Sequence, residues 1–147
     1  METIIDNQQK YLNYREQMGR LTKAMKSGFY LEAIFIEYAI MEDRLESVLR
    51  HSKKWNPKSS QFVSLDYKRK KVEKLAEEKK SLASKYFTKE LTDMIDRWRK
   101  DRNDLIHELL KQSLHTEDIR DIATEGHRIV KILNSKATSY NRIVDRK

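Results

Sequence analysis

The sequence contains no cysteine, a single proline and only three glycines among 147 residues. Without cysteine, the chain can form no disulfide framework, no thiolate metal site and no thiol nucleophile, which fits a reducing compartment. The scarcity of glycine and proline excludes collagen-like and Pro/Gly-rich disordered chains. The longest nearly apolar stretch, residues 33–41, is far too short to span a membrane, and the first residues include acids rather than a basic leader. We expect a soluble, cytoplasmic chain that does not enter a membrane.

Apolar residues recur at spacings of three and four along almost the whole chain, which is the pattern of amphipathic helices. Ser27 and Gly28 interrupt the first stripe, and residues 52–64, which include the only proline, form the one long loop that the sequence predicts. With 38% hydrophobic residues, a chain of this length can close one modest core. We predict an all-α, single-domain bundle of about five helices over residues 1–147. The predicted helices cover residues 4–25, 29–51, 65–86, 91–109 and 116–133.

The formal charge of +8 comes from the middle of the chain. Residues 51–102 hold 16 bases and 8 acids, whereas the segments on either side are nearly balanced. Clustered bases are the footprint expected for a polyanion such as a nucleic acid, although a solvated lysine-rich face gives the same pattern. If the chain binds RNA, we expect these side chains to contact its backbone: Lys53, Lys54, Lys68, Arg69, Lys70, Lys71, Arg99 and Lys100.

One arginine stands where the helical pattern calls for an apolar residue. The predicted stripe at positions 91, 95, 98, 102, 105 and 109 consists of Leu, Ile and Trp except at Arg102. Such a guanidinium must reach water, pair with a carboxylate, or face a cleft or subunit interface where an anion binds. Glu37 is the only charged residue in the apolar stretch 33–41. We therefore predict that Glu37 holds or orients Arg102; the alternative is that Glu37 faces solvent.

Asn103 and His107 follow Arg102 and lie four residues apart, so they share one flank of the same predicted helix. Arginine binds phosphate through its fork of N–H donors, and histidine titrates near neutral pH. Together these residue types suit phosphodiester chemistry by proton transfer and charge stabilisation. A structural role is the competing interpretation for a single histidine on a helix.

The segment Arg102-Asn103-Asp104-Leu105-Ile106-His107 resembles the R-x-x-x-x-H motif of the HEPN superfamily, whose arginine is typically followed by a polar residue such as asparagine. HEPN domains are small all-α bundles that carry the motif on a late helix. Many are metal-independent ribonucleases that dimerise to form one composite cleft. The chain departs from the toxins paired with nucleotidyltransferases, which carry tyrosine two residues after the histidine, because Leu109 occupies that position.

The resemblance implies an endoribonuclease that uses the 2′-hydroxyl of single-stranded RNA as the nucleophile and needs no cofactor. His107 would transfer protons, Arg102 would hold the phosphate, and Asn103 would orient the phosphate or the histidine. The resemblance also implies a homodimer acting as a toxin or phage-defence effector, with an antitoxin or a bound non-coding RNA as possible partners. The alternative function is a non-catalytic helical module that binds RNA or another protein.

A metal site is the remaining alternative that the sequence raises. Asp104 and His107 have the acid-x-x-His spacing of carboxylate-bridged di-metal bundles. Those sites need a second such pair, which this sequence lacks, so we predict no metal.

Overall fold

The computed structural model describes residues 7–55, 63–78, 81–111 and 113–146. Within these ranges the chain forms helices and no strands, which confirms the all-α prediction. Six helices follow one another along the described chain: α1 (Asn7–Ser27), α2 (Tyr30–His51), α3 (Leu65–Glu77), α4 (Leu82–Tyr86), α5 (Lys89–Glu108) and α6 (Thr116–Asp145).

The turn predicted at Ser27 and Gly28 is present and separates α1 from α2. Gly28 has a φ of 77°, a conformation that glycine adopts without a steric penalty. The backbone N–H of Phe29 donates to the carbonyl of Ala24 at 2.9 Å, which ends α1 in a hydrogen-bonded turn. The helices α3, α4 and α5 each begin at a side-chain cap, where a Ser or Thr hydroxyl accepts from a backbone N–H three residues later.

The single helix predicted over residues 65–86 is wrong, because the structure divides this segment into α3 and α4. Glu78 adopts an extended conformation at the end of α3, and Ser81 caps the new helix by accepting from the N–H of Ser84. Serine at this position competes with the continuing helix by bonding the backbone. The predicted Pro57 loop lies mostly outside the described residues.

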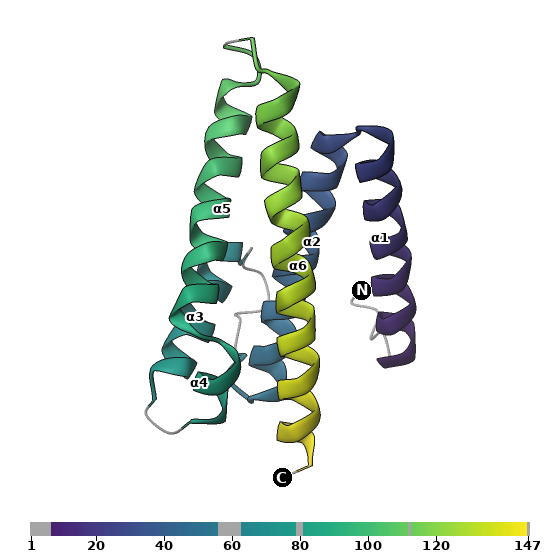
Figure 1. Cartoon of the computed structure of the whole chain (residues 1–147). Coiled ribbons are helices and arrows are strands. Elements are labelled where there is room, and N and C mark those ends of the chain that lie inside the picture. Colours follow the sequence, from purple (N-terminus) through teal and green to yellow (C-terminus); the bar gives the residue numbers. More distant parts are fainter. Residues whose placement is uncertain (1–6, 56–62, 79–80, 112, 147) are drawn as a thin grey trace.

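The helix α2 is central, as its broad apolar surface predicts. It packs most extensively along α6 and also contacts α1 and α3, while α5 packs on α6 and α3 (Figure 1). Buried side chains from all these helices form one core, in which Met41, Leu45 and Val48 of α2 are fully covered. Phe35 is an exception to the expected burial of α2, because 72% of it is exposed.

The helix α6 is longer than the stripe from residue 116 to 133 indicates, since it continues to Asp145 and runs the length of the molecule (Figure 1). The connection between α5 and α6 lies at one end of the bundle. The first turn of α1 and the last turn of α6 lie toward the opposite end. Among the described helices, none combines the length and the apolar character that crossing a lipid bilayer requires.

Candidate functional site

The helix α5 carries the R-x-x-x-x-H motif in its second half. Its apolar stripe packs into the core through Leu91, Ile95, Trp98 and Leu105, which are all at least 95% buried. The indole N–H of Trp98 donates to the carbonyl of Ile122 on α6 at 3.0 Å. These contacts fix the rotation of α5 about its own axis. The packing of the core therefore also determines the direction in which Arg102 leaves the helix.

Arg102 is half-buried beside the aromatic ring of Tyr38 on α2. Its guanidinium carbon lies 4.1 Å from the ring centroid, which is a close cation–π contact. The Nη1 group donates to Oδ1 of Asn103 at 3.0 Å, and the buried Nε has no hydrogen-bond partner. No carboxylate among the described residues forms an ion pair with Arg102. The side chain is therefore an oriented cation whose charge no described carboxylate compensates.

Asn103 is half-buried against Arg102, and His107 is exposed in the last turn of α5. The structure thus brings Arg102 and Asn103 into direct contact. It places His107 on the same helix but shows no hydrogen bond to its ring within the described part of the chain. No described residue forms a hydrogen bond that orients the imidazole.

The prediction that Glu37 holds Arg102 is wrong. Glu37 is fully buried, and neither of its carboxyl oxygens has a hydrogen-bond partner. Burial raises the pKa of Glu37 to about 9, so the carboxyl is protonated at neutral pH and carries no charge that could pair with Arg102. The alternative that Glu37 faces solvent is also wrong.

Glu37 instead lies against Gly126 of α6, together with Trp98. A β-carbon at position 126 would lie 2.7 Å from both Cδ of Glu37 and Nε1 of Trp98, and closer still to Oε1 of Glu37. Glycine is therefore required where α2, α5 and α6 come together. Sequence reasoning found Glu37 as an anomaly but missed this contact, since nothing in the local pattern links it to residue 126.

Two of the predicted RNA contacts, Lys68 and Arg69, are corrected by the structure, because each is only 7% exposed. Lys68 forms ion pairs with Glu42 and Glu46 of α2, both at 3.3 Å. These internal carboxylates already satisfy the ammonium group, so Lys68 is not available to a nucleic acid.

Arg69 lies at the centre of a second set of ion pairs, which joins α3 to α5. It contacts Asp66 at 3.0 Å, Glu73 at 2.7 Å and Asp96 at 3.6 Å. Arg99, another predicted RNA contact, contacts the same Asp66 and Asp96 at 3.4 and 3.0 Å. We call these five residues the α3–α5 ion-pair cluster. Arg69 and Arg99 hold two helices together and contribute little to a free basic surface.

The two aspartates of this cluster are held in their charged form. Burial acts to raise the pKa of Asp66, but hydrogen bonds from Lys70 and Arg69 outweigh it, so the pKa lies below its ordinary value. For Asp96, burial is likewise outweighed by hydrogen bonds from Arg99 and Lys100, and its pKa is also lowered. Both carboxylates are therefore structural partners of the bases.

The remaining predicted RNA contacts are exposed: Lys53, Lys54, Lys70, Lys71 and Lys100. Lys70 and Lys100 each bridge to an aspartate of the ion-pair cluster at 3.1 Å, although more than 60% of each side chain remains exposed. The basic surface that a polyanion could reach is thus smaller than the sequence indicates.

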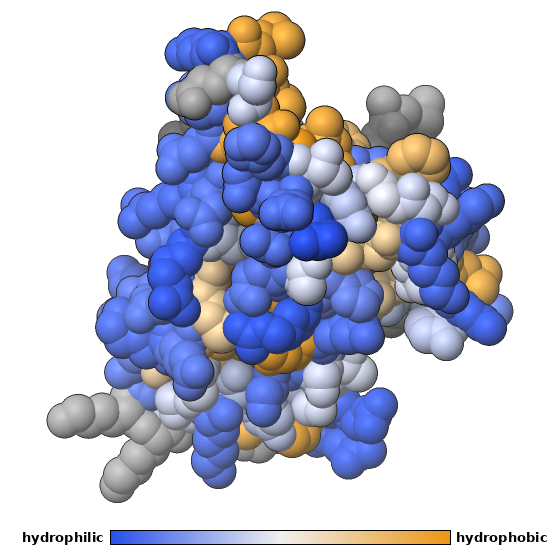
Figure 2. All heavy atoms as spheres, turned by 45° about the horizontal axis from the view of Figure 1, so that its top comes forward, coloured by the Kyte–Doolittle hydropathy of each residue, from blue (hydrophilic) through white to orange (hydrophobic). Residues whose placement is uncertain are grey.

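Exposed apolar residues stand on and just after the second half of α5 and on the first half of α2. Ile106 is 45% exposed and Leu110 is fully exposed, on either side of His107 in the sequence. On α2, Leu31 and Phe35 precede Tyr38 by two turns and one turn, respectively, and are also exposed. Figure 2 shows hydrophobic side chains gathered at the end of the molecule that carries the connection between α5 and α6. We call Leu31, Phe35, Ile106 and Leu110 the apolar face.

The sequence analysis did not identify Tyr38 as the partner of Arg102. Tyr38 lies within the apolar stretch 33–41, and no spacing rule pairs residues on two different helices. The acids of the ion-pair cluster could have been found, because Asp66 and Glu73 stand three and four residues from Arg69. In the ranges that the structure describes, no group of three or more His, Asp or Glu side chains is placed to hold a metal ion.

No protein-family model, no curated protein and no solved structure matches this chain.

Proposed function

We propose that the chain is a metal-independent RNA endonuclease of the HEPN type, which acts as a homodimer. The observation that carries the proposal is Arg102. Its guanidinium is oriented by Tyr38 and Asn103 and has no carboxylate partner among the described residues, and Asn103 lies one helical turn before the exposed His107. A half-buried arginine with a purely structural role would be expected to pair with a carboxylate.

The reaction would be an internal transesterification within RNA. The 2′-hydroxyl oxygen attacks the adjacent phosphorus, the bond from phosphorus to the 5′-oxygen breaks, and the products carry a 2′,3′-cyclic phosphate and a 5′-hydroxyl. His107 would take the proton from the 2′-hydroxyl or give a proton to the leaving 5′-oxygen. Arg102 would stabilise the charge that develops on the phosphate, and Asn103 would fix the guanidinium in place. No bound water or metal ion enters this scheme.

A dimer would supply what one copy lacks. Ile106 and Leu110 of the apolar face flank His107 in the sequence, and Leu110 exposes its whole side chain to water. Covering such a surface with a second copy is favourable by about 25 cal/mol per Å² of apolar area. The same contact would bring two copies of His107 together, so that one could act as base and the other as acid.

Cleavage of a labelled single-stranded RNA pool in EDTA tests the proposal. We expect the wild-type protein to cut RNA and to leave 2′,3′-cyclic phosphate ends. His107→Ala and Arg102→Ala should each lower the rate at least about 100-fold, the usual contribution of a proton-transfer group. The matched controls are His115→Ala, an exposed histidine in the connection after α5, and Arg97→Ala, an exposed arginine on α5. Both should keep full activity.

The competing function is a non-catalytic module that binds RNA or a protein partner. It is favoured by the internal ion pairs that occupy Lys68, Arg69 and Arg99, and no described residue forms a hydrogen bond to the ring of His107. In that case, no RNA in the pool is cut, and the His107→Ala variant binds its partner as well as the wild type does.

A further inference from the structure

A polar groove runs between α1 and α6, with α2 as its floor, toward the end of the molecule opposite the connection between α5 and α6. It arises because α1 packs on α2 and touches α6 only lightly. The hollow measures about 540 Å³, which lies in the range of small-molecule sites. None of Arg102, Asn103 and His107 lines it, so the groove is separate from the site described above.

Positive charge exceeds negative charge along the groove. Lys10, Arg44 and Arg142 line it, and the charges of Lys10 and Arg142 have no carboxylate partner among the described residues. Arg44 donates to Asp43 at 2.6 Å, and its guanidinium carbon lies 5.6 Å from the ring centroid of Tyr14. The one acid in the lining, Asp145, is held by His51 through a contact of 2.7 Å. The unbalanced charge favours an anionic ligand.

One buried polar atom in the lining lacks a partner. Asn141 is 8% exposed, and its amide nitrogen donates to the hydroxyl of Ser47 at 3.1 Å. Its Oδ1 accepts no hydrogen bond. Leaving a buried acceptor unsatisfied costs roughly 1–3 kcal/mol, and this oxygen is too enclosed for a ligand in the groove to reach, so Asn141 serves only to report on the groove wall.

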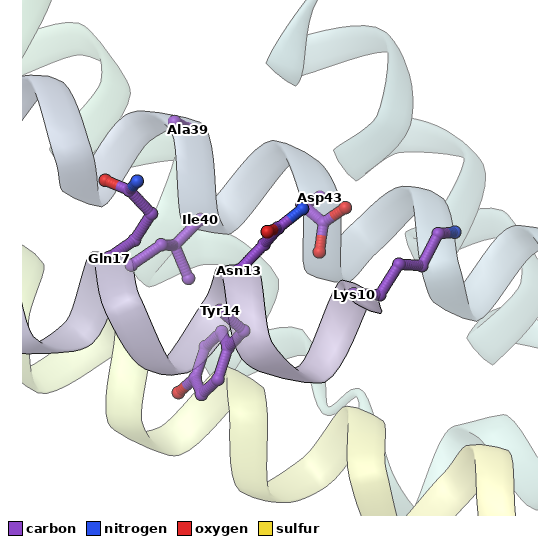
Figure 3. Close-up of a pocket in the computed structure, with 7 residues that line it drawn as sticks. All are labelled: Lys10, Asn13, Tyr14, Gln17, Ala39, Ile40 and Asp43. Atoms are coloured by element: carbon purple, nitrogen blue, oxygen red, sulfur yellow. The ribbon is translucent and has the colours of Figure 1, made fainter. Parts of the chain in front are cut away.

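Aromatic rings border the same groove. Tyr14 extends from α1 toward α6, and Lys10 lies one turn before it on the same helix (Figure 3). Tyr11 also lines the hollow and is 61% exposed, so a face of its ring is free for stacking. A planar heterocycle gains roughly 1–3 kcal/mol from stacking on such a ring.

We propose that this groove binds a nucleotide. Its phosphate would contact Lys10, Arg44 and Arg142, and its base would stack on Tyr11. A nucleotide combines the anion and the planar ring that these side chains favour. The same chemistry is offered by a free mononucleotide and by one residue of an RNA strand.

The test follows the side-chain amide signal of Asn141 by ¹H–¹⁵N NMR while ligand is added. The probes are AMP, GMP, CMP, UMP, adenosine, inorganic phosphate and a 5′-phosphorylated tetra-adenylate. We expect at least one nucleotide to shift the Asn141 signal with saturation, and to bind at least about tenfold more tightly than phosphate or adenosine. If a mononucleotide binds as tightly as the tetranucleotide, the groove is a site for free nucleotides. Clearly tighter binding of the tetranucleotide assigns it to RNA.

Substitutions test whether the nucleotide binds in this groove. Arg142→Ala and Lys10→Ala, both at exposed positions, should each weaken nucleotide binding about tenfold. Lys136→Ala, an exposed lysine on the opposite side of α6, and His107→Ala should leave it unchanged. The proposal is overturned if no nucleotide or tetranucleotide shifts the signal, if phosphate alone binds as tightly, or if the Arg142→Ala variant binds normally. Because His107 takes no part, loss of RNA cleavage in that variant does not affect this outcome.

Discussion

The buried carboxyl of Glu37 makes a quantitative prediction about pH and stability. Its pKa rises from 4.5 to about 9 on folding. Between these two values, the folded chain keeps a proton that the unfolded chain has released. Because the folded state binds more protons, the free energy of unfolding falls as the pH rises through this window, and the stability that Glu37 contributes is fully present only below about pH 4.5.

The size of the effect follows from the same shift. One pH unit changes the free energy of unfolding by about 1.4 kcal/mol when one proton separates the two states. From pH 5 to pH 8, Glu37 should therefore lower the stability by up to about 4 kcal/mol. That is a large fraction of the roughly 5–15 kcal/mol by which domains are stable.

Glu37→Gln removes the titrating group and keeps the size of the side chain. Between pH 5 and pH 8, we expect the free energy of unfolding measured in urea to fall by about 4 kcal/mol less for the variant than for the wild type. Comparing the two proteins cancels the contributions of other groups, such as His127, whose pKa burial lowers. Parallel stability curves for the two proteins over this range would refute the reasoning, because they would show that Glu37 is ionised or paired in solution.

Three further predictions concern packing, ion pairs and assembly. Gly126→Ala should destabilise the fold by about 1–3 kcal/mol in urea unfolding, because the added methyl overlaps Glu37, and an equal or higher stability would contradict the packing. Arg69→Met should lower the free energy of unfolding by about 2–4 kcal/mol without weakening RNA binding. If the RNA affinity measured by filter binding falls in proportion to the lost charge, Arg69 is an RNA contact after all. Phe35→Ser combined with Leu110→Ser should shift the mass measured by light scattering from dimer to monomer, whereas a wild-type protein that is already monomeric would remove the basis for a composite cleft.

The fold class could be predicted because helical periodicity is local. Each apolar stripe indicates one helix, and the glycine at position 28 indicates the turn that separates α1 from α2. The break before Ser81 was missed, since the apolar positions of α3 and α4 continue one stripe across it. Competition between a serine cap and one more helical turn depends on tertiary packing, which a single stripe does not encode.

The candidate site was predicted in part for the same reason. The anomaly of Arg102 was visible because it interrupts a local pattern, and its contact with Asn103 follows from their adjacency. Its stacking on Tyr38 joins two helices that are distant in sequence, and no spacing rule gives such a contact. Glu37 was assigned to Arg102 on the assumption that a buried acid must be charged. Complete burial instead favours the neutral acid, which needs no cation.

The length of α6 links the two ends of the molecule mechanically. Gly126 and Asn141 stand on one uninterrupted helix, and their separation of 15 positions corresponds to roughly 22 Å. At Gly126 there is no room for even a methyl group between α6 and the side chains of Glu37 and Trp98. A tilt of a few degrees about the groove end would carry Gly126 by roughly 1 Å. Such a tilt would change the contact that α6 makes with Trp98, one turn before Arg102.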